Sequence, residues 1–135
     1  MEFGKILILY IATFGVFFLI DLIWLILMNS RFYKKELSKL MAEKVKWFPA
    51  ILFYLLFIIA VLVLVVLPAV SNGSWITALL HGGLLGMVCY GTYDLTNLAS
   101  IRYWPLKVTV VDILWGTVLS ATVSTTSFFI ATAIK

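Results

Sequence analysis

Three of the six acidic residues in this 135-residue chain stand inside long apolar segments: Asp21, Asp94 and Asp112. A charged side chain near the centre of a bilayer costs about 2.5–3.5 kcal/mol on insertion scales. Such residues either form a site for an ion, proton or ligand, or bond to a neighbouring helix and hold a bundle together. Carboxylates that lie close together repel each other, so at least one must be protonated or paired with a cation. The chemistry on offer is therefore binding of a proton, a cation or a polar headgroup.

The three aspartates are predicted to lie at similar depths in the membrane. Basic residues of the flanking loops follow Asp21 by ten positions, follow Asp94 by eight and precede Asp112 by five. At a rise of 1.5 Å per residue, these separations are roughly 15, 12 and 7–8 Å. The sequence therefore predicts a carboxyl layer beneath one membrane surface, supplied by three different helices.

Aromatic and amide side chains accompany the aspartates at helical spacing. Trp24 and Trp115 each follow an aspartate by three residues, which places them on the same helix faces. The candidate residues for ligand or ion binding are Asp21, Trp24, Tyr54, Tyr90, Tyr93, Asp94, Asn97, Asp112 and Trp115. Arg31, Arg102 and Lys107 could reach inward as partners of the carboxylates. The alternative is that each aspartate bonds separately to a neighbouring helix or loop arginine.

The elements that position these residues must lie in a membrane. The chain is 64% hydrophobic and 12% charged, whereas soluble proteins are about 45–50% apolar and about 25% charged. This composition excludes a disordered chain, a disulfide scaffold and a soluble enzyme. Segments 6–28, 48–70, 75–99 and 106–134 each supply the roughly 20 residues that a helix needs to cross a bilayer. The predicted fold is an all-α integral membrane protein, a four-transmembrane-helix bundle in a single domain over residues 1–135.

Basic residues set the expected orientation. Eight of the ten lie in the first and third loops: Arg31, Lys34, Lys35, Lys39, Lys44, Lys46, Arg102 and Lys107. The positive-inside rule places these loops in the cytoplasm and both termini outside. The net charge of +4 is then a topology signal and needs no nucleic-acid partner. In the first loop, six apolar residues recur near helical spacing and predict a short amphipathic interfacial helix over about 31–46: Tyr33, Leu37, Leu40, Met41, Val45 and Phe48.

Small residues indicate which helices pack closely. The third and fourth spans carry small and polar residues at steps of three or four, and this spacing lets helix backbones approach in lipid. The packing residues expected there are Gly82, Gly86, Gly116, Ser120 and Ser124. The second span is apolar almost all round and is expected to face lipid over most of its circumference. A homodimer would enclose a transport pathway more easily than one small bundle, and Gly82 and Gly86 are a possible contact between its two copies.

Motifs for nucleophilic, phosphate or metal chemistry are absent from the sequence. The lone histidine, His81, lies about 20 Å from Asp94 by helix rise and fits packing better than haem ligation. Cys89, the single cysteine, is expected to be a small packing residue. We therefore expect no catalytic residues, no metal and no cofactor.

Three segments resemble a known family: Asp21–Trp24, Gly91–Ala99 and Trp104–Thr117. The chain is similar over nearly its whole length to the small bacterial membrane proteins called domain of unknown function 2177. The positions that recur in this family are Asp21, Trp24, Tyr93, Asp94, Asn97, Trp104, Pro105, Asp112, Trp115 and Gly116. The resemblance implies a multi-pass protein of the bacterial inner membrane, and it supports the predicted site without assigning an activity.

Two classes of function remain open at this point. The first is a small transporter-like protein that binds or moves a proton, a cation or a small polar or lipid headgroup at the aspartate layer. The second is a non-catalytic accessory or assembly subunit of a membrane or lipid-modifying system, with a membrane protein as partner. A lipid-active enzyme could use the aspartates for acid–base chemistry, but the sequence shows no nucleophile–base pair.

Overall fold

The computed structural model describes residues 1–41, 44 and 46–135, and this part of the chain is helical with no strand. The first long helix comprises α1 (Phe3–Met28), the π-helical turn η1 (Asn29–Tyr33) and α2 (Lys34–Leu37). The second comprises α3 (Trp47–Ala60), the π-helical segment η2 (Val61–Val66) and α4 (Leu67–Asn72). The third is α5 (Trp75–Ser100), and the fourth is α6 (Leu106–Ile134).

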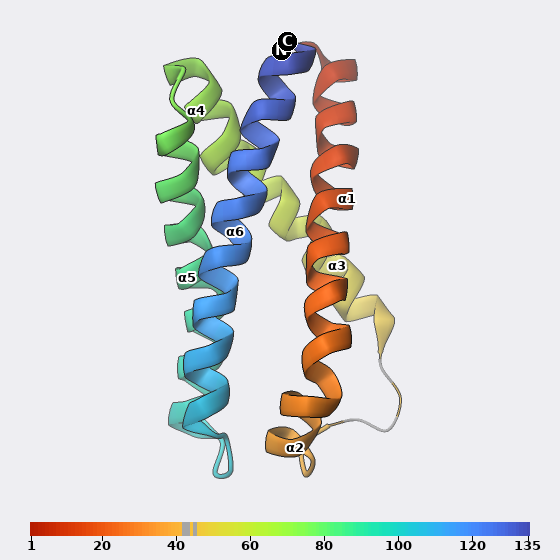
Figure 1. The fold of residues 1–135 in the computed structure, drawn as a ribbon, viewed down its shortest axis with the longest axis vertical. Coiled ribbons are helices and arrows are strands. Elements are labelled where there is room, and N and C mark those ends of the chain that lie inside the picture. Colours follow the sequence, from red (N-terminus) through yellow and green to blue (C-terminus); the bar gives the residue numbers. More distant parts are fainter. Residues whose placement is uncertain (42–43, 45) are drawn as a thin grey trace.

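Four helices in the described residues are long and apolar enough to cross a membrane: Phe3–Leu37, Trp47–Asn72, Trp75–Ser100 and Leu106–Ile134. The predicted four-helix membrane bundle is therefore confirmed. Both termini lie at one end, and α2 lies at the other end with the loop from α5 to α6 (Figure 1). We call this second end the basic end, because it carries Arg31, Lys34, Lys35, Lys39, Arg102 and Lys107.

A short local turn joins the second and third long helices. Gly73 adopts a left-handed backbone conformation (φ 65°), which glycine takes without strain, and it ends α4. Ser74 then caps α5, since its hydroxyl oxygen accepts a hydrogen bond from the backbone N–H of Thr77 at 3.2 Å. The turn places α4 and α5 side by side in opposite directions.

The helices α5 and α6 form the closest pair, as the small residues predicted. A Cβ at Gly86 would overlap the carbonyl oxygen of Gly116, and a Cβ at Gly82 would overlap the side chain of Ser124. These residues and Ser120 are buried between the two helices. The suggested homodimer contact at Gly82 and Gly86 is therefore wrong, because α6 of the same chain already covers both glycines.

The second long helix is exposed at 14 of its 26 residues, as expected of a helix that largely faces lipid, and it also contributes seven side chains to the core. Its buried side chains are Phe57, Ile58, Val61, Leu62, Val65, Val66 and Ala69. A helix that is apolar all round carries no signal for the side that will be buried. In the structure η2 packs against α5 and α6, while α3 packs against α1 and leans away from α5 (Figure 1).

The helix expected over 31–46 is shorter than predicted. Regular helix ends at Leu37, a turn follows over residues 38–40, and Ala42, Glu43 and Val45 lie outside the described residues. Tyr33, Leu37 and Met41, which formed part of the predicted apolar face, line a pocket between the helices. Tyr33 and Leu37 are half-buried, whereas Met41 remains 40% exposed, so the interfacial position of this part of the loop stays a prediction.

Candidate functional site

A pocket of about 580 Å³ lies among the helices on the side of the basic end. Small-molecule sites typically measure about 300–1,000 Å³. The pocket is lined by these predicted site residues: Asp21, Trp24, Tyr54, Tyr90, Tyr93, Asp94, Asp112 and Trp115. Asn97 is half-buried and does not line it. The three aspartates therefore meet at one pocket, although each stands in a different bonding environment.

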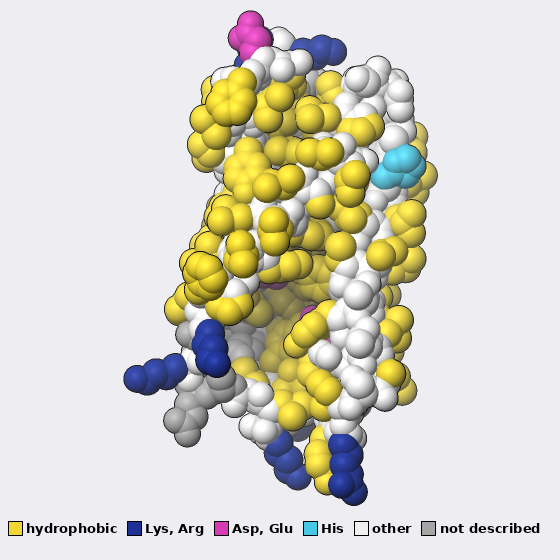
Figure 2. All heavy atoms as spheres, turned by 180° about the vertical axis from the view of Figure 1, so that it is seen from behind, with side chains coloured by type: hydrophobic (Ala, Val, Ile, Leu, Met, Phe, Trp, Pro, Cys, Tyr) yellow, Lys and Arg dark blue, Asp and Glu magenta, His cyan; other side chains and the backbone are white. Residues whose placement is uncertain are grey.

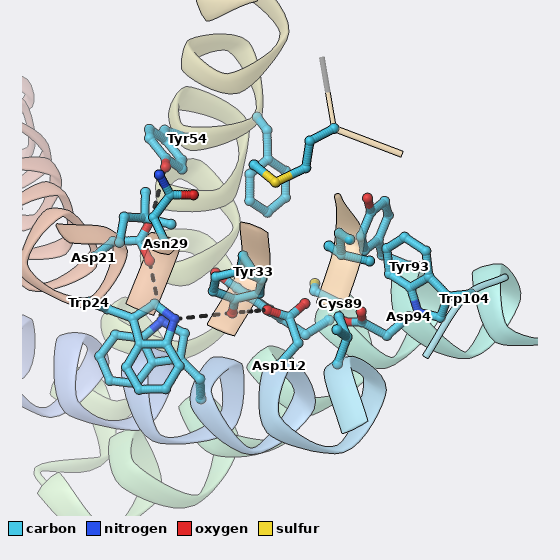
Figure 3. A pocket seen from close by; sticks show the side chains of 17 residues that line it. Asp21, Trp24, Asn29, Tyr33, Tyr54, Cys89, Tyr93, Asp94, Trp104 and Asp112 are labelled. Atoms are coloured by element: carbon cyan, nitrogen blue, oxygen red, sulfur yellow. Dashed lines mark hydrogen bonds between the residues drawn. The ribbon is translucent and has the colours of Figure 1, made fainter. Parts of the chain in front are cut away.

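Asp21 bonds to two other helices. One carboxylate oxygen accepts a hydrogen bond from the Tyr54 hydroxyl on α3 at 2.8 Å, and the other accepts from the Trp115 indole N–H on α6 at 3.2 Å (Figure 3). The side chain is 8% exposed. Asp21 thus holds α1, α3 and α6 together, and the structural interpretation fits this aspartate.

Asp112 belongs to a chain of hydrogen bonds that reaches the first loop. Its carboxylate accepts from the Tyr33 hydroxyl at 2.8 Å, and the Tyr33 oxygen accepts from the Trp24 indole N–H at 3.1 Å (Figure 3). The indole of Trp24 also stacks on that of Trp115, with ring centres 4.2 Å apart. This network ties η1 to α6 and fixes one wall of the pocket.

Asp94 has no such support. Its side chain is 0% exposed, and neither carboxylate oxygen has a hydrogen-bond partner among the residues that the structure describes. The carboxyl of Asp112 lies beside it (Figure 3). Ionised carboxylates only accept hydrogen bonds, so the two can satisfy each other only by sharing a proton or by holding a cation. A buried, unpaired carboxylate is costly. Asp94 is therefore the pocket residue that a bound cation or hydrogen-bond donor would stabilise.

The basic residues expected to pair with the aspartates do not do so in the described part of the chain. The donors to Asp21 and Asp112 are phenol and indole groups. Arg102 instead lies 5.5 Å from the centre of the exposed Tyr103 ring, and Lys39 lies 5.3 Å from it. Arg102 and Lys39 are exposed at the basic end, so they do not neutralise the carboxyl pair of Asp94 and Asp112.

Aromatic side chains form most of the remaining wall. Within the described ranges, the aromatic residues at the pocket are Trp24, Tyr33, Phe53, Tyr54, Tyr90, Tyr93, Trp104 and Trp115. Tyr93 and Trp104 meet edge to face with ring centres 5.6 Å apart. The ring of Tyr90 lies where a Cβ of Gly116 would be, so the glycine on α6 is also what admits this ring.

Sequence reasoning missed several residues of the wall. Tyr33 was assigned to an interfacial helix, Cys89 was assigned to packing, and Asn29 was not considered, yet all three line the pocket. The signal for Tyr33 was present as an apolar helix face that needed a partner. His81 is exposed and stands outside the pocket.

The donor set does not match a metal centre. In residues 1–41, 44 and 46–135, no three His, Cys, Asp or Glu side chains gather closely enough to hold a metal ion. Asp21 directs its oxygens to Tyr54 and Trp115, so it does not join the Asp94–Asp112 pair. Two neighbouring carboxyls among aromatic rings remain.

The family described as "Predicted membrane protein (DUF2177)" has a model that matches residues 6–129. The chain belongs to this family. The DUF2177 match includes all four candidate spans in large part, and every residue that lines the pocket falls within it. No curated protein and no solved structure matches the chain. The suspected resemblance is confirmed, and the DUF2177 description supplies a membrane setting without an activity.

Proposed function

We propose that this DUF2177 protein binds an organic ammonium cation in the pocket, as a small transporter-like or ligand-holding protein of the bacterial inner membrane. The observation that carries the proposal is Asp94, which is fully buried, lacks a hydrogen-bond partner in the described residues and stands beside Asp112. A cation between the two carboxyls would supply the positive charge that the surrounding residues withhold. An anionic ligand would add a third negative group to the same place.

The walls favour an ammonium group over an inorganic cation. Aromatic faces attract ammonium groups through the ring quadrupole, and this attraction reaches about 2 kcal/mol or more when the groups are desolvated. A metal ion would need more oxygen ligands than two neighbouring carboxylates supply. A pocket of about 580 Å³ also has room for an organic molecule.

The proposed orientation places the basic end in the cytoplasm. Arg31, Lys34, Lys35, Lys39, Arg102 and Lys107 are concentrated at this end. Cytoplasmic loops carry an excess of such residues. The pocket would then lie in the cytoplasmic half of the membrane, and both termini would lie outside.

Binding of alkyltrimethylammonium ions to the purified protein in a nonionic detergent tests the proposal. Trp24, Trp104 and Trp115 line the pocket, so their fluorescence should report a bound cation. The series runs from tetramethylammonium to decyltrimethylammonium. At least one member is expected to bind, and Asp94→Asn is expected to weaken its binding tenfold or more. Glu2→Gln, which also removes one negative charge but at an exposed position, is the matched control.

Two results would contradict the proposal. One is equal binding by the wild type and Asp94→Asn. The other is binding of no member of the series by a folded wild-type protein, which would favour the accessory-subunit interpretation. Co-purification with a membrane protein partner would then be the next measurement.

A further inference from the structure

The pocket has a side opening between two of the membrane helices. Seen from behind, the surface is hollowed between α3 and α5, and acidic side chains show inside the hollow (Figure 2). Phe53 on α3 and Tyr93 on α5 both line the pocket, and they are 42% and 59% exposed. They therefore form two sides of the rim, at the outer surface of the bundle.

This opening lies within the two candidate spans and away from their ends. Phe53 is six residues after the start of α3 at Trp47, and Tyr93 is seven residues before the end of α5 at Ser100. At 1.5 Å per residue, both stand roughly 9–11 Å inside the helix ends. Leu52 and Leu56 on α3 and Leu95 on α5 are exposed close by, which is expected of surfaces that face lipid chains.

The opening has an identifiable structural cause. Two hydrogen bonds tie α3 to α1: the Tyr54 hydroxyl donates to Asp21 at 2.8 Å, and the Tyr10 hydroxyl donates to the carbonyl oxygen of Leu55 at 2.8 Å. The described residues show no hydrogen bond between α3 and α5. The part of the helix that precedes η2, which is α3, therefore follows α1 and diverges from α5. The π-helical segment stands at this divergence, and such segments are frequent at functional sites.

The opposite side of the pocket is less suited to a water-soluble ligand. Leu37, Met41 and Trp104 line it toward the basic end, so a polar molecule from water would pass apolar side chains there. Among the described residues, a ligand that already lies in the bilayer would first meet the rim of Phe53 and Tyr93.

We infer that the ligand is an amphiphile: an alkyl-chain ammonium whose cationic head lies at Asp94 and Asp112 and whose chain leaves between α3 and α5 into the bilayer. This inference rests on the proposed function and adds the chemical class of the ligand and its route. Charge complementarity determines the head, because the buried end of the pocket is acidic. The apolar rim within the candidate spans determines the tail.

Photocrosslinking in nonionic detergent tests the inference. The probe is decyltrimethylammonium with a diazirine near the end of its chain, and the sites of attachment are mapped by mass spectrometry of peptides. Attachment is expected on α3 and α5 at least fivefold above that on α1, whose exposed Leu19 and Ile23 report random contact with detergent. Excess unlabelled decyltrimethylammonium should remove the preference. Asp94→Asn should also remove it, with Asp112→Asn as a second variant if the first does not fold.

The chain-length series separates the failure of this inference from that of the proposed function. If the chain occupies the opening, decyltrimethylammonium should bind at least tenfold more tightly than tetramethylammonium on the scale of total ligand. If tetramethylammonium binds as tightly as decyltrimethylammonium, or more tightly, and this binding depends on the aspartates, the ligand is not an amphiphile but the ammonium site remains. Equal attachment of the probe to all exposed helix faces would also overturn the inference that the ligand is an amphiphile. Preferred attachment that survives both aspartate variants would overturn both proposals.

Discussion

Asp21 and Asp94 line the same pocket, yet their replacement by asparagine is expected to change stability in opposite directions. Asp94→Asn should raise the free energy of unfolding, because the wild-type carboxyl is fully buried without a hydrogen-bond partner in the described residues and lies beside Asp112. Asp21→Asn should lower it, because the wild-type carboxylate accepts from Tyr54 at 2.8 Å and from Trp115 at 3.2 Å. An asparagine has one acceptor oxygen and can keep one of these two bonds.

The magnitudes follow from the number of bonds. An unpartnered buried polar group costs about 1–3 kcal/mol, and a charged one costs more. The amide in Asp94→Asn is uncharged and can donate to the neighbouring Asp112 carboxylate, so we expect a gain of about 1–2 kcal/mol. Hydrogen bonds between membrane helices contribute about 0.6 kcal/mol on average and up to about 1.7 kcal/mol. Loss of one bond at Asp21, with a donor left unsatisfied, should therefore cost about 1–2 kcal/mol.

The assay is equilibrium unfolding in mixed micelles, in which the fraction of a denaturing detergent is raised and helix content is followed by circular dichroism. The two variants should differ from each other by about 2–4 kcal/mol, with the wild type between them. Measurement without added ammonium ligand is essential, since a ligand that binds Asp94 would stabilise only the wild type. Loss of stability in Asp94→Asn equal to that in Asp21→Asn would refute the assignment of a structural role to one aspartate and a ligand role to the other.

Three further outcomes are expected. Gly86→Ala should lower the free energy of unfolding by about 1–3 kcal/mol, because the new Cβ would overlap a carbonyl oxygen of α6. In the same assay the control Gly15→Ala, whose Cβ would meet open space, should leave the free energy of unfolding unchanged or raise it by up to about 1 kcal/mol. Tyr33→Phe removes a hydrogen bond to α6 and should speed hydrogen exchange over residues 29–37 severalfold, whereas Tyr103→Phe, at an exposed ring, should not. In a variant without the native cysteine, an impermeant thiol reagent applied to intact cells should label a cysteine at the C-terminus and not one in the third loop; the reverse pattern would contradict the proposed orientation.

The features that could be predicted from the sequence are those with a local or periodic signal. Uninterrupted apolar segments of about 20 residues have few alternatives to a membrane helix, which is why the expected spans agree closely with α1, α5 and α6. Small residues at steps of four predicted the contact between α5 and α6, because glycines such as Gly82 and Gly86 allow another helix backbone to come close. Helix rise alone placed the three aspartates at one level.

The features that could not be predicted depend on long-range partners. The bond between Tyr33 and Asp112 joins residues 79 positions apart, and apolar periodicity in the first loop fits either a membrane surface or a pocket wall. The second span is almost uniformly apolar, so its sequence determines neither its buried side nor the direction of α3. Which aspartate is satisfied depends on that direction, since it decides which carboxyl Tyr54 reaches.

The tilt of α3 connects the structural and the ligand-binding roles of the aspartates. By leaning toward α1, α3 brings Tyr54 to Asp21, and this leaves the α5 side of the pocket without a donor from that helix. The same tilt separates α3 from α5 and exposes Phe53 and Tyr93 at the hollow. The satisfied carboxyl, the unsatisfied carboxyl and the side opening of the pocket thus share one geometric cause. If α3 packed against α5 instead, the side opening would close and Asp21 would lose a donor. The bond that stabilises this part of the bundle is therefore also the bond that keeps the proposed ligand site open.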